Sequence, residues 1–243
     1  MNLILDIGNT RTKVAIFDND KIVDIKIFEE LLLCDIEFLL RNYADTNNCI
    51  LSKTGKIDEI LFQYLKNTFP NLIELQSSTN LPFINNYKSK ETQGPDRIAA
   101  IAGATVIFPN ENVLVIDAGT AIKFDFVDAS AHYLGGNISP GIEMRFKALN
   151  TFTQKLPFLR KSEIEGLLGD NTETAIIYGV QNAVIFEIEG YISAIKKDFP
   201  NLKTIITGGD AEFLAGKIKS STLVDLNLVL KGLNRILHYN TQQ

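Results

Sequence analysis

The 243-residue chain is long enough to bury a substantial core, in one large domain or two small ones. Its formal net charge of −5 and its sequence pI near 5.2 leave no basic surface, so we expect no nucleic-acid partner. No apolar run approaches the roughly 20 residues needed to cross a bilayer, so no membrane partner is expected either.

The first apolar run and the cysteines bear on the location of the protein. Asp6 interrupts that run and no basic stretch precedes it, so we expect no signal peptide. Cys34 and Cys49 form no CxxC pair and cannot make a zinc site alone. We expect both to be buried, reduced thiols in a cytoplasmic protein.

The first half of the chain alternates between strand and helix patterns. Three short strands joined by polar turns come first, followed by amphipathic helices that alternate with strands. The predicted strands are 3–8, 12–17, 21–28, 49–53 and 72–75, and the predicted helices are 29–43, 57–69 and 97–108. Residues 76–95 form a long polar loop, and loops of this length are usually functional or mobile.

The second half of the chain opens with a segment whose sequence resembles the beginning of the first half. VLVIDAGTAIKFDFVD, residues 113–128, resembles LILDIGNTRTKVAIFD, residues 3–18: Asp117 corresponds to Asp6 and Gly119 to Gly8. Aligning Lys123 with Lys13 requires a gap of one residue. A third strand, 132–139, and a helix follow, which favours duplication over chance similarity. We therefore predict an α/β protein of two similar lobes, residues 1–111 and 112–243, each opening with a three-stranded meander.

The turns of the two hairpins have the composition of phosphate-binding sites. Backbone N–H groups in such turns form concavities that bind anions, and glycine allows a phosphate to approach closely. Asn9, Thr10 and Thr120 add side-chain donors. Asp6 and Asp117 would repel a bare polyphosphate, so cations are expected between them. The alternative for each turn is an Asx-type turn with solvated acids.

Six motifs in order carry a specific resemblance. No P-loop, Rossmann, HExxH or GxSxG signature is present. The motifs are DIGNTRTK (6–13), GPDR (94–97), DAGTA (117–121), GGNISPG (135–141), NTETAIIYGV (171–180) and TGGD (207–210). This set resembles the type III pantothenate kinases, members of the superfamily of acetate and sugar kinases, heat-shock chaperones and actin. The match covers nearly the whole chain.

The resemblance implies a fold and an activity. It implies two ribonuclease H-like lobes with a nucleotide cleft between them, and ATP-dependent phosphorylation of pantothenate to 4′-phosphopantothenate, the first step of coenzyme A synthesis. It also implies Mg²⁺, a monovalent cation such as K⁺ or NH₄⁺, and a homodimer in which Thr172 reaches pantothenate across the subunit boundary. Two other classes stay open, a noncatalytic regulatory or transcription-accessory relative and another ATPase or sugar kinase of the superfamily.

The same resemblance implies roles for individual residues. Asp96 would be the general base, Asp117 would hold the monovalent cation, and Asp6 would lie near Mg²⁺ directly or through water. TGGD would border the adenosine. The implied ATP-binding residues are Asp6, Ile7, Gly8, Asn9, Thr10, Arg11, Thr12, Lys13 and Thr120. The implied pantothenate-binding residues are Tyr87, Gly94, Pro95, Asp96, Arg97 and Thr172.

Several of these residues also have plain structural interpretations. Asp96 could be the N-cap of the helix that follows it, and Thr172 the N-cap of a helix beginning near Glu173. Arg97 could be a surface residue. Lys123, which stands where the family pattern usually has threonine, could reach phosphate or lie in solvent. Pro95, Gly135, Gly136, His132 and His238 are read as structural, the two glycines at a bulge or turn between strand and helix.

Overall fold

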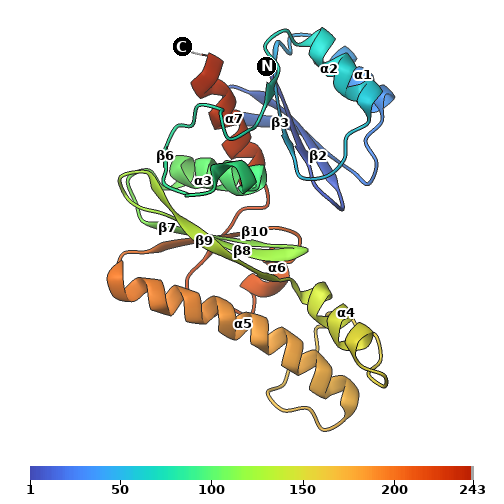
Figure 1. Cartoon of the computed structure of the whole chain (residues 1–243), viewed down its shortest axis with the longest axis vertical. Coiled ribbons are helices and arrows are strands. Elements are labelled where there is room, and N and C mark those ends of the chain that lie inside the picture. The colour runs from blue at the N-terminus through green and yellow to red at the C-terminus, as the bar shows by residue number, and fades with distance from the viewer. Residues whose placement is uncertain (242–243) are drawn as a thin grey trace. The chain divides into compact units, whose positions relative to one another are not determined.

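A computed structural model describes residues 1–241, and its contacts divide the chain into two compact units (Figure 1). The first unit contains Met1–Pro109, Ala131–Leu134 and the chain from Asn227 onward. The second contains Asn110–Ser130 and Gly135–Leu226. The lobe boundary at residues 111 and 112 stays a prediction; the contacts first divide the chain between Pro109 and Asn110 and assign two later segments to the first unit.

The first unit contains a mixed sheet in which the predicted meander forms as expected. β1 to β3 are consecutive antiparallel strands, whereas β4 lies parallel to β1 and β5 parallel to β4, which gives the order β3-β2-β1-β4-β5. The strands are β1 Asn2–Ile7, β2 Thr12–Asp18, β3 Lys21–Phe28, β4 Asn48–Lys53 and β5 Ile73–Glu74. All five predicted strands of this half are therefore confirmed, with small shifts of their ends.

Two helices, α1 Leu33–Asn42 and α2 Glu59–Thr68, pack on one face of this sheet. Their buried leucine, isoleucine and phenylalanine side chains meet Leu3, Leu5 and Ile7 of β1. The predicted start of α1 at Glu29 is wrong. The Asp35 carboxylate accepts a hydrogen bond from the Leu32 backbone N–H, which sets the beginning of the helix at Leu33.

The remaining helices of the first unit, α3 Pro95–Ile107 and α7 Leu228–Thr241, pack against each other at backbone distance. A Cβ on Gly232 of α7 would lie 1.7 Å from the Ala99 carbonyl oxygen of α3. α7 also contacts β1 and β4. The predicted loop 76–95 is not wholly irregular, because it contains the short strand β6 Ile84–Asn85 and the 3₁₀ turn η1 Lys90–Thr92.

The second unit repeats the arrangement of the first around β7. β7 lies between antiparallel β8 and parallel β10, just as β1 lies between antiparallel β2 and parallel β4. The sheet has the order β11-β10-β7-β8-β9-β6; its last pairing, between β6 and His132–Tyr133 at the start of β9, lies within the first unit. The strands are β7 Val113–Ala118, β8 Ala121–Val127, β9 His132–Pro140, β10 Lys203–Thr207 and β11 Leu223–Val224.

Three helices complete the second unit: α4 Ile142–Phe152, α5 Thr172–Asp198 and α6 Ala211–Ala215. The long helix α5 runs along one face of the sheet (Figure 1) and buries Ile176, Val180, Val184, Ile188 and Ile192 there. This burial explains most of the apolar positions of α5. Gly135 and Gly136 lie within β9, so their predicted place between strand and helix is wrong; Gly135 has a φ of +130°.

The strand register of the two hairpins explains why aligning Lys123 with Lys13 requires a gap of one residue. Asp6 pairs directly across from Lys13, and Asp117 directly across from Lys123. The first turn spans residues 8–11 and the second only 119–121, so the missing residue lies in the turn and leaves each aspartate opposite a lysine. In residues 1–241 no helix combines the length and the apolar character that crossing a membrane requires.

Candidate active site

The turn after β1 is held in shape by its own backbone and by residues 54 and 55. The Gly8 N–H donates to the Arg11 carbonyl at 3.1 Å, and the N–H groups of Thr54 and Gly55 donate to the Ile7 carbonyl. A Cβ on Gly55 would lie 2.2 Å from the Gly8 carbonyl oxygen, so only glycine fits there. Asn9, Thr10 and Arg11 are exposed, as a turn that receives an anion requires.

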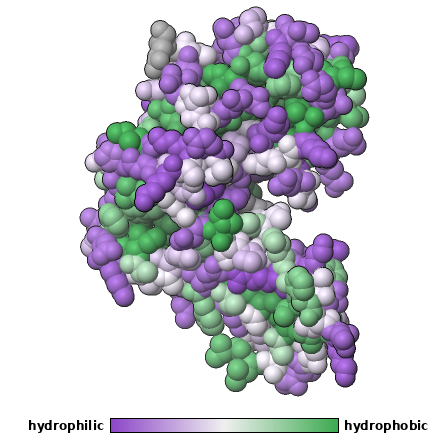
Figure 2. Space-filling model, viewed as in Figure 1, coloured by the Kyte–Doolittle hydropathy of each residue, from purple (hydrophilic) through white to green (hydrophobic). Residues whose placement is uncertain are grey.

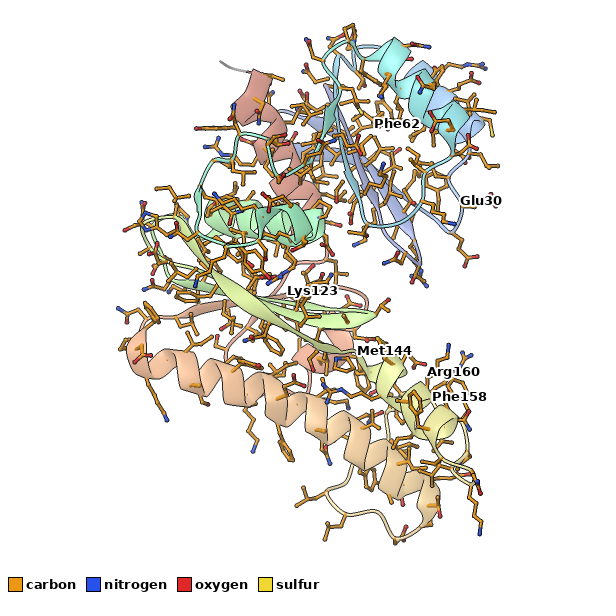
Figure 3. All side chains as sticks on the ribbon, viewed as in Figure 1. Glu30, Phe62, Lys123, Met144, Phe158 and Arg160 are labelled. Carbon is orange, nitrogen blue, oxygen red and sulfur yellow. The ribbon has the colours of Figure 1, made fainter. Side chains whose placement is uncertain are left out.

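A cavity of about 630 Å³ adjoins this turn within the first unit. It is lined by residues 7–10 and Thr12 of the first hairpin, and by residues 29–33, 55–58 and Leu61. Glu30, one of the lining residues, is labelled in Figure 3. The sequence did not point to residues 55–58 as neighbours of the turn. Only the parallel pairing of β4 with β1 brings them there.

Asp6 is the carboxylate to which the resemblance assigns Mg²⁺, and its chemistry suits that ion. It lies at the end of β1, while its neighbours Leu5 and Ile7 point into the core on the α1 and α2 side. Residues 1–241 contain no group of three or more histidine, cysteine, aspartate or glutamate side chains that could enclose a metal. Mg²⁺ commonly binds one or two carboxylates together with substrate phosphates, and Asp6 fits that mode.

Asp96 lies in the first turn of α3. The N-cap is Gly94, Pro95 is the first helical residue and Asp96 the second, so the N-cap interpretation of Asp96 is wrong. The Asp96 Oδ1 accepts a hydrogen bond from the Arg97 backbone N–H at 3.0 Å. A Cβ on Gly94 would lie 2.5 Å from this oxygen, so glycine makes room for the carboxylate.

Arg97 is buried, so the surface interpretation is wrong. Its side chain is 4% exposed, and its Nη2 donates to the Tyr133 hydroxyl oxygen at 2.9 Å. Nη1 donates to the Tyr87 hydroxyl oxygen at 3.4 Å, and the guanidinium carbon lies 5.2 Å from the centre of the Tyr87 ring. The two tyrosine rings stack at 5.9 Å. The result is a buried cluster next to Asp96 in which two tyrosine hydroxyls accept hydrogen bonds from one guanidinium group.

The sequence motifs did not identify Tyr133 and Gln93 as neighbours of this site. Tyr133 is completely buried, and β6 pairs with β9 at this residue. Gln93 is 7% exposed; its Oε1 accepts from Asn85 Nδ2, and its amide nitrogen has no hydrogen-bond partner in residues 1–241. The only available signal for Gln93 was its place directly before GPDR.

The turn after β7 is packed against glycines of two other motifs. The Gly141 N–H donates to the Thr120 carbonyl at 3.1 Å, and a Cβ on Gly141 would lie 2.1 Å from the Gly119 carbonyl oxygen. Gly208, from TGGD, has a φ of +95°, and a Cβ there would lie 2.6 Å from Asp117 Oδ1. GGNISPG and TGGD therefore support this turn sterically, and side chains at these glycines would displace it.

Asp117 already has a cationic partner. Lys123 Nζ lies 2.8 Å from Asp117 Oδ2, and the two side chains are only 21% and 17% exposed. Lys123, labelled in Figure 3, is therefore not a solvated lysine. The resemblance assigns a monovalent cation to this carboxylate. The arrangement in the structure does not fit that ion, because the lysine ammonium takes the place of an ion at Oδ2.

Thr172 is the first residue of α5. Asn171 is the N-cap, with its side chain accepting from the Thr174 N–H at 3.0 Å, so the N-cap interpretation of Thr172 is wrong. Thr172 is exposed, and its contact with pantothenate stays a prediction. In TGGD, the Asp210 carboxylate pairs with Lys161, and the Asp210 N–H donates to the Ala118 carbonyl at 2.9 Å.

Comparison with known proteins identifies the family. A model of the type III pantothenate kinase family matches residues 2–194. The chain belongs to this family. A type III pantothenate kinase of Bacteroides fragilis (strain YCH46) is 44% identical over 240 residues, which are 99% of this chain and 98% of that protein.

Solved structures support the fold. A protein from Campylobacter jejuni described as a Baf family transcriptional activator is 26% identical, with a TM-score of 0.62, covering 99% of this chain and 100% of that one. A glucokinase from an Antarctic psychrotroph has a TM-score of 0.53 at 13% identity and covers 98% of each chain. The two mixed sheets are those of two ribonuclease H-like lobes, as in the sugar kinases.

Proposed function

We propose that this protein transfers the γ-phosphoryl group of ATP to the hydroxyl of pantothenate, giving 4′-phosphopantothenate in the first step of coenzyme A synthesis. The observation that carries the proposal is the match to type III pantothenate kinases along nearly the full chain, at 44% identity to the Bacteroides fragilis enzyme. The six motifs that led to the family also supply the residues that the reaction needs.

The turn residues 6–13 and Thr120 receive the triphosphate in this proposal. Their exposed backbone N–H groups and hydroxyls favour it, since such turns bind phosphate oxygens. Asp6 would hold Mg²⁺, directly or through water, and Mg²⁺ would neutralise charge on the phosphates. TGGD would border the adenosine. The predicted nucleotide cleft stays a prediction.

Asp96 is the proposed general base. Its carboxylate takes the proton from the pantothenate hydroxyl while the hydroxyl oxygen bonds to the γ-phosphorus, and the bond to the bridging oxygen of ADP breaks. Proton transfer of this kind contributes about 10²–10⁴-fold. Arg97 and Tyr87, with Gly94 and Pro95, would bind pantothenate; the positive charge of the guanidinium, held in place by Tyr87 and Tyr133, favours an anionic substrate near Asp96.

A homodimer and a cytoplasmic location complete the proposal. Large apolar side chains lie exposed on the second unit, Phe152 (86%), Leu167 (72%), Leu168 (87%) and Phe186 (60%). Hydrophobic atoms are visible on this part of the surface in Figure 2. Apolar side chains that gather into a contiguous exposed patch favour association, and in a dimer Thr172 would reach the pantothenate of the other subunit. Both cysteines are free thiols, as in reducing compartments.

A substrate panel tests the function. Purified protein is incubated with ATP, Mg²⁺ and either pantothenate or a set of hexoses, and products are identified by mass spectrometry. We expect 4′-phosphopantothenate and ADP in equal amounts, and no sugar phosphate. A sugar phosphate would instead indicate a sugar kinase. No phosphorylated product from any acceptor would favour a noncatalytic regulatory or transcription-accessory relative; the Campylobacter jejuni protein is described as a transcriptional activator.

A further inference from the structure

Lys123 is fixed against Asp117 by the register of the β7–β8 hairpin. The two residues are direct cross-strand partners, so their side chains leave the sheet on the same face. Ile116, Ala118, Ile122 and Phe124 point into the α5 core, and Asp117 and Lys123 therefore lie on the opposite face. The lysine stem needs no unusual geometry to bring its ammonium group to the carboxylate.

The contact has the features of a built-in counter-ion. Nζ lies 2.8 Å from Asp117 Oδ2, and both side chains are mostly shielded from solvent. Gly208 lies against the other carboxylate oxygen, Oδ1. A carboxylate largely removed from water needs a compensating positive charge, and Lys123 supplies one as an ammonium group covalently tethered to the neighbouring strand. A second cation at Oδ2 would be repelled by that ammonium group.

We propose that the Lys123 ammonium group replaces the monovalent cation beside Asp117, so that phosphoryl transfer in this protein needs no K⁺ or NH₄⁺. The inference rests on the proposed function, in which the turn after β7 binds ATP phosphate. The fixed charge of Lys123 then stands next to that turn and offsets the charge of Asp117, which would otherwise repel the nucleotide.

The test compares K⁺ with tetramethylammonium, a cation too bulky for such a site, at matched ionic strength. For the unaltered protein we expect the rate of 4′-phosphopantothenate formation to differ by less than about twofold between the two salts, since general screening is equal. For Lys123→Thr we expect a rate at least about tenfold lower in tetramethylammonium, restored by KCl, because Asp117 is then open to an ion.

Two further variants separate the role of the charge from the role of the position. Lys123→Met keeps the length of the side chain without its charge; we expect it to be slow and not restored by KCl, since the thioether fills the space. Lys203→Thr is the control for loss of a lysine elsewhere: Lys203, in β10, pairs with Glu111 at 3.9 Å and not with Asp117. We expect the rate of this variant to be the same in K⁺ as in tetramethylammonium.

A second readout does not depend on turnover. The thermal unfolding midpoint is measured in both salts, with and without a non-hydrolysable ATP analogue, because an ion that binds the folded state raises it. K⁺ should raise the midpoint of Lys123→Thr but not that of the unaltered protein. A K⁺-dependent rate or midpoint in the unaltered protein, or no K⁺ response in Lys123→Thr, would overturn the inference. If the protein forms no product but K⁺ raises the unfolding midpoint of Lys123→Thr and not that of the unaltered protein, only the proposed function is refuted.

Discussion

The carboxylate of Asp96 is oriented by its own helix. Oδ1 accepts the Arg97 backbone N–H at 3.0 Å, and Gly94 leaves space against it. A base held this way loses little entropy when it meets the substrate hydroxyl, and phosphoryl transfer depends largely on such alignment. The neighbouring guanidinium is equally fixed, by Tyr133 and Tyr87.

Asp96→Asn tests the base directly. The amide oxygen can still accept the Arg97 N–H but cannot take a proton at neutral pH, so we expect turnover to fall at least about 100-fold. The circular dichroism spectrum and the unfolding midpoint should stay nearly unchanged. Asp198→Asn, an exposed change at the last residue of α5, is the matched control and should retain full turnover. Near-normal turnover in Asp96→Asn would remove Asp96 from this role.

The sequence identified the candidate residues but not their partners. Asp6, Asp96 and Asp117 follow from motifs, because short runs of acid, glycine and hydroxyl residues are visible in one dimension. Tyr133 could not be identified in this way, because its contact with Arg97 depends on the pairing of β6 with β9 across about fifty residues of chain. The partner of Lys123 likewise required the strand register, which sets the cross-strand neighbours.

At the scale of elements, the strands were easier to predict than the helix ends. The β1–β3 meander was recovered because apolar strands alternate with polar turns there. The start of α1 was misplaced because Leu31, Leu32 and Leu33 continue the apolar pattern, while the deciding interaction is the Asp35 side chain accepting from Leu32 N–H. Apolar periodicity reports burial, and it does not report where a helix is capped.

The contact between α3 and α7 gives a prediction for stability. In Gly232→Ala the new methyl group would overlap the Ala99 carbonyl, so the two helices must separate. We expect a loss of about 1–3 kcal/mol or more in the free energy of unfolding, measured by urea denaturation followed by circular dichroism. Gly179→Ala is the control, because a Cβ there meets nothing within 4 Å. It should be neutral or stabilising by up to about 1 kcal/mol, and an equal loss in both variants would contradict the packing argument.

At the scale of the whole molecule, the chemical reactivity of the two cysteine thiols distinguishes the folded from the unfolded protein. Cys34 is exposed, contrary to expectation, whereas Cys49 is buried in the first-unit core, where desolvation raises the pKa of its thiol well above the usual value. The thiolate is the reactive form, so both burial and the raised pKa protect Cys49. An aromatic disulfide reagent should modify one thiol per native chain at pH 8 and both in urea.

Cys34→Ser is the matched control for that measurement. The native variant should then react only as fast as the first unit opens, which makes the rate of modification a measure of opening. Rapid reaction of native Cys34→Ser would show that Cys49 is accessible and would contradict the packing of β4 described above.

The placement of α7 has a consequence for how this protein is made. α7 contacts β1 and β4, which precede it in the chain by about 175 residues or more. Vectorial synthesis normally allows an early domain to close before the next one appears. Here the nascent first unit must wait, with part of its apolar surface uncovered, until the intervening second unit and α7 have been synthesised. A fold in which a later helix completes an earlier unit therefore lengthens the interval in which that unit is open to aggregation.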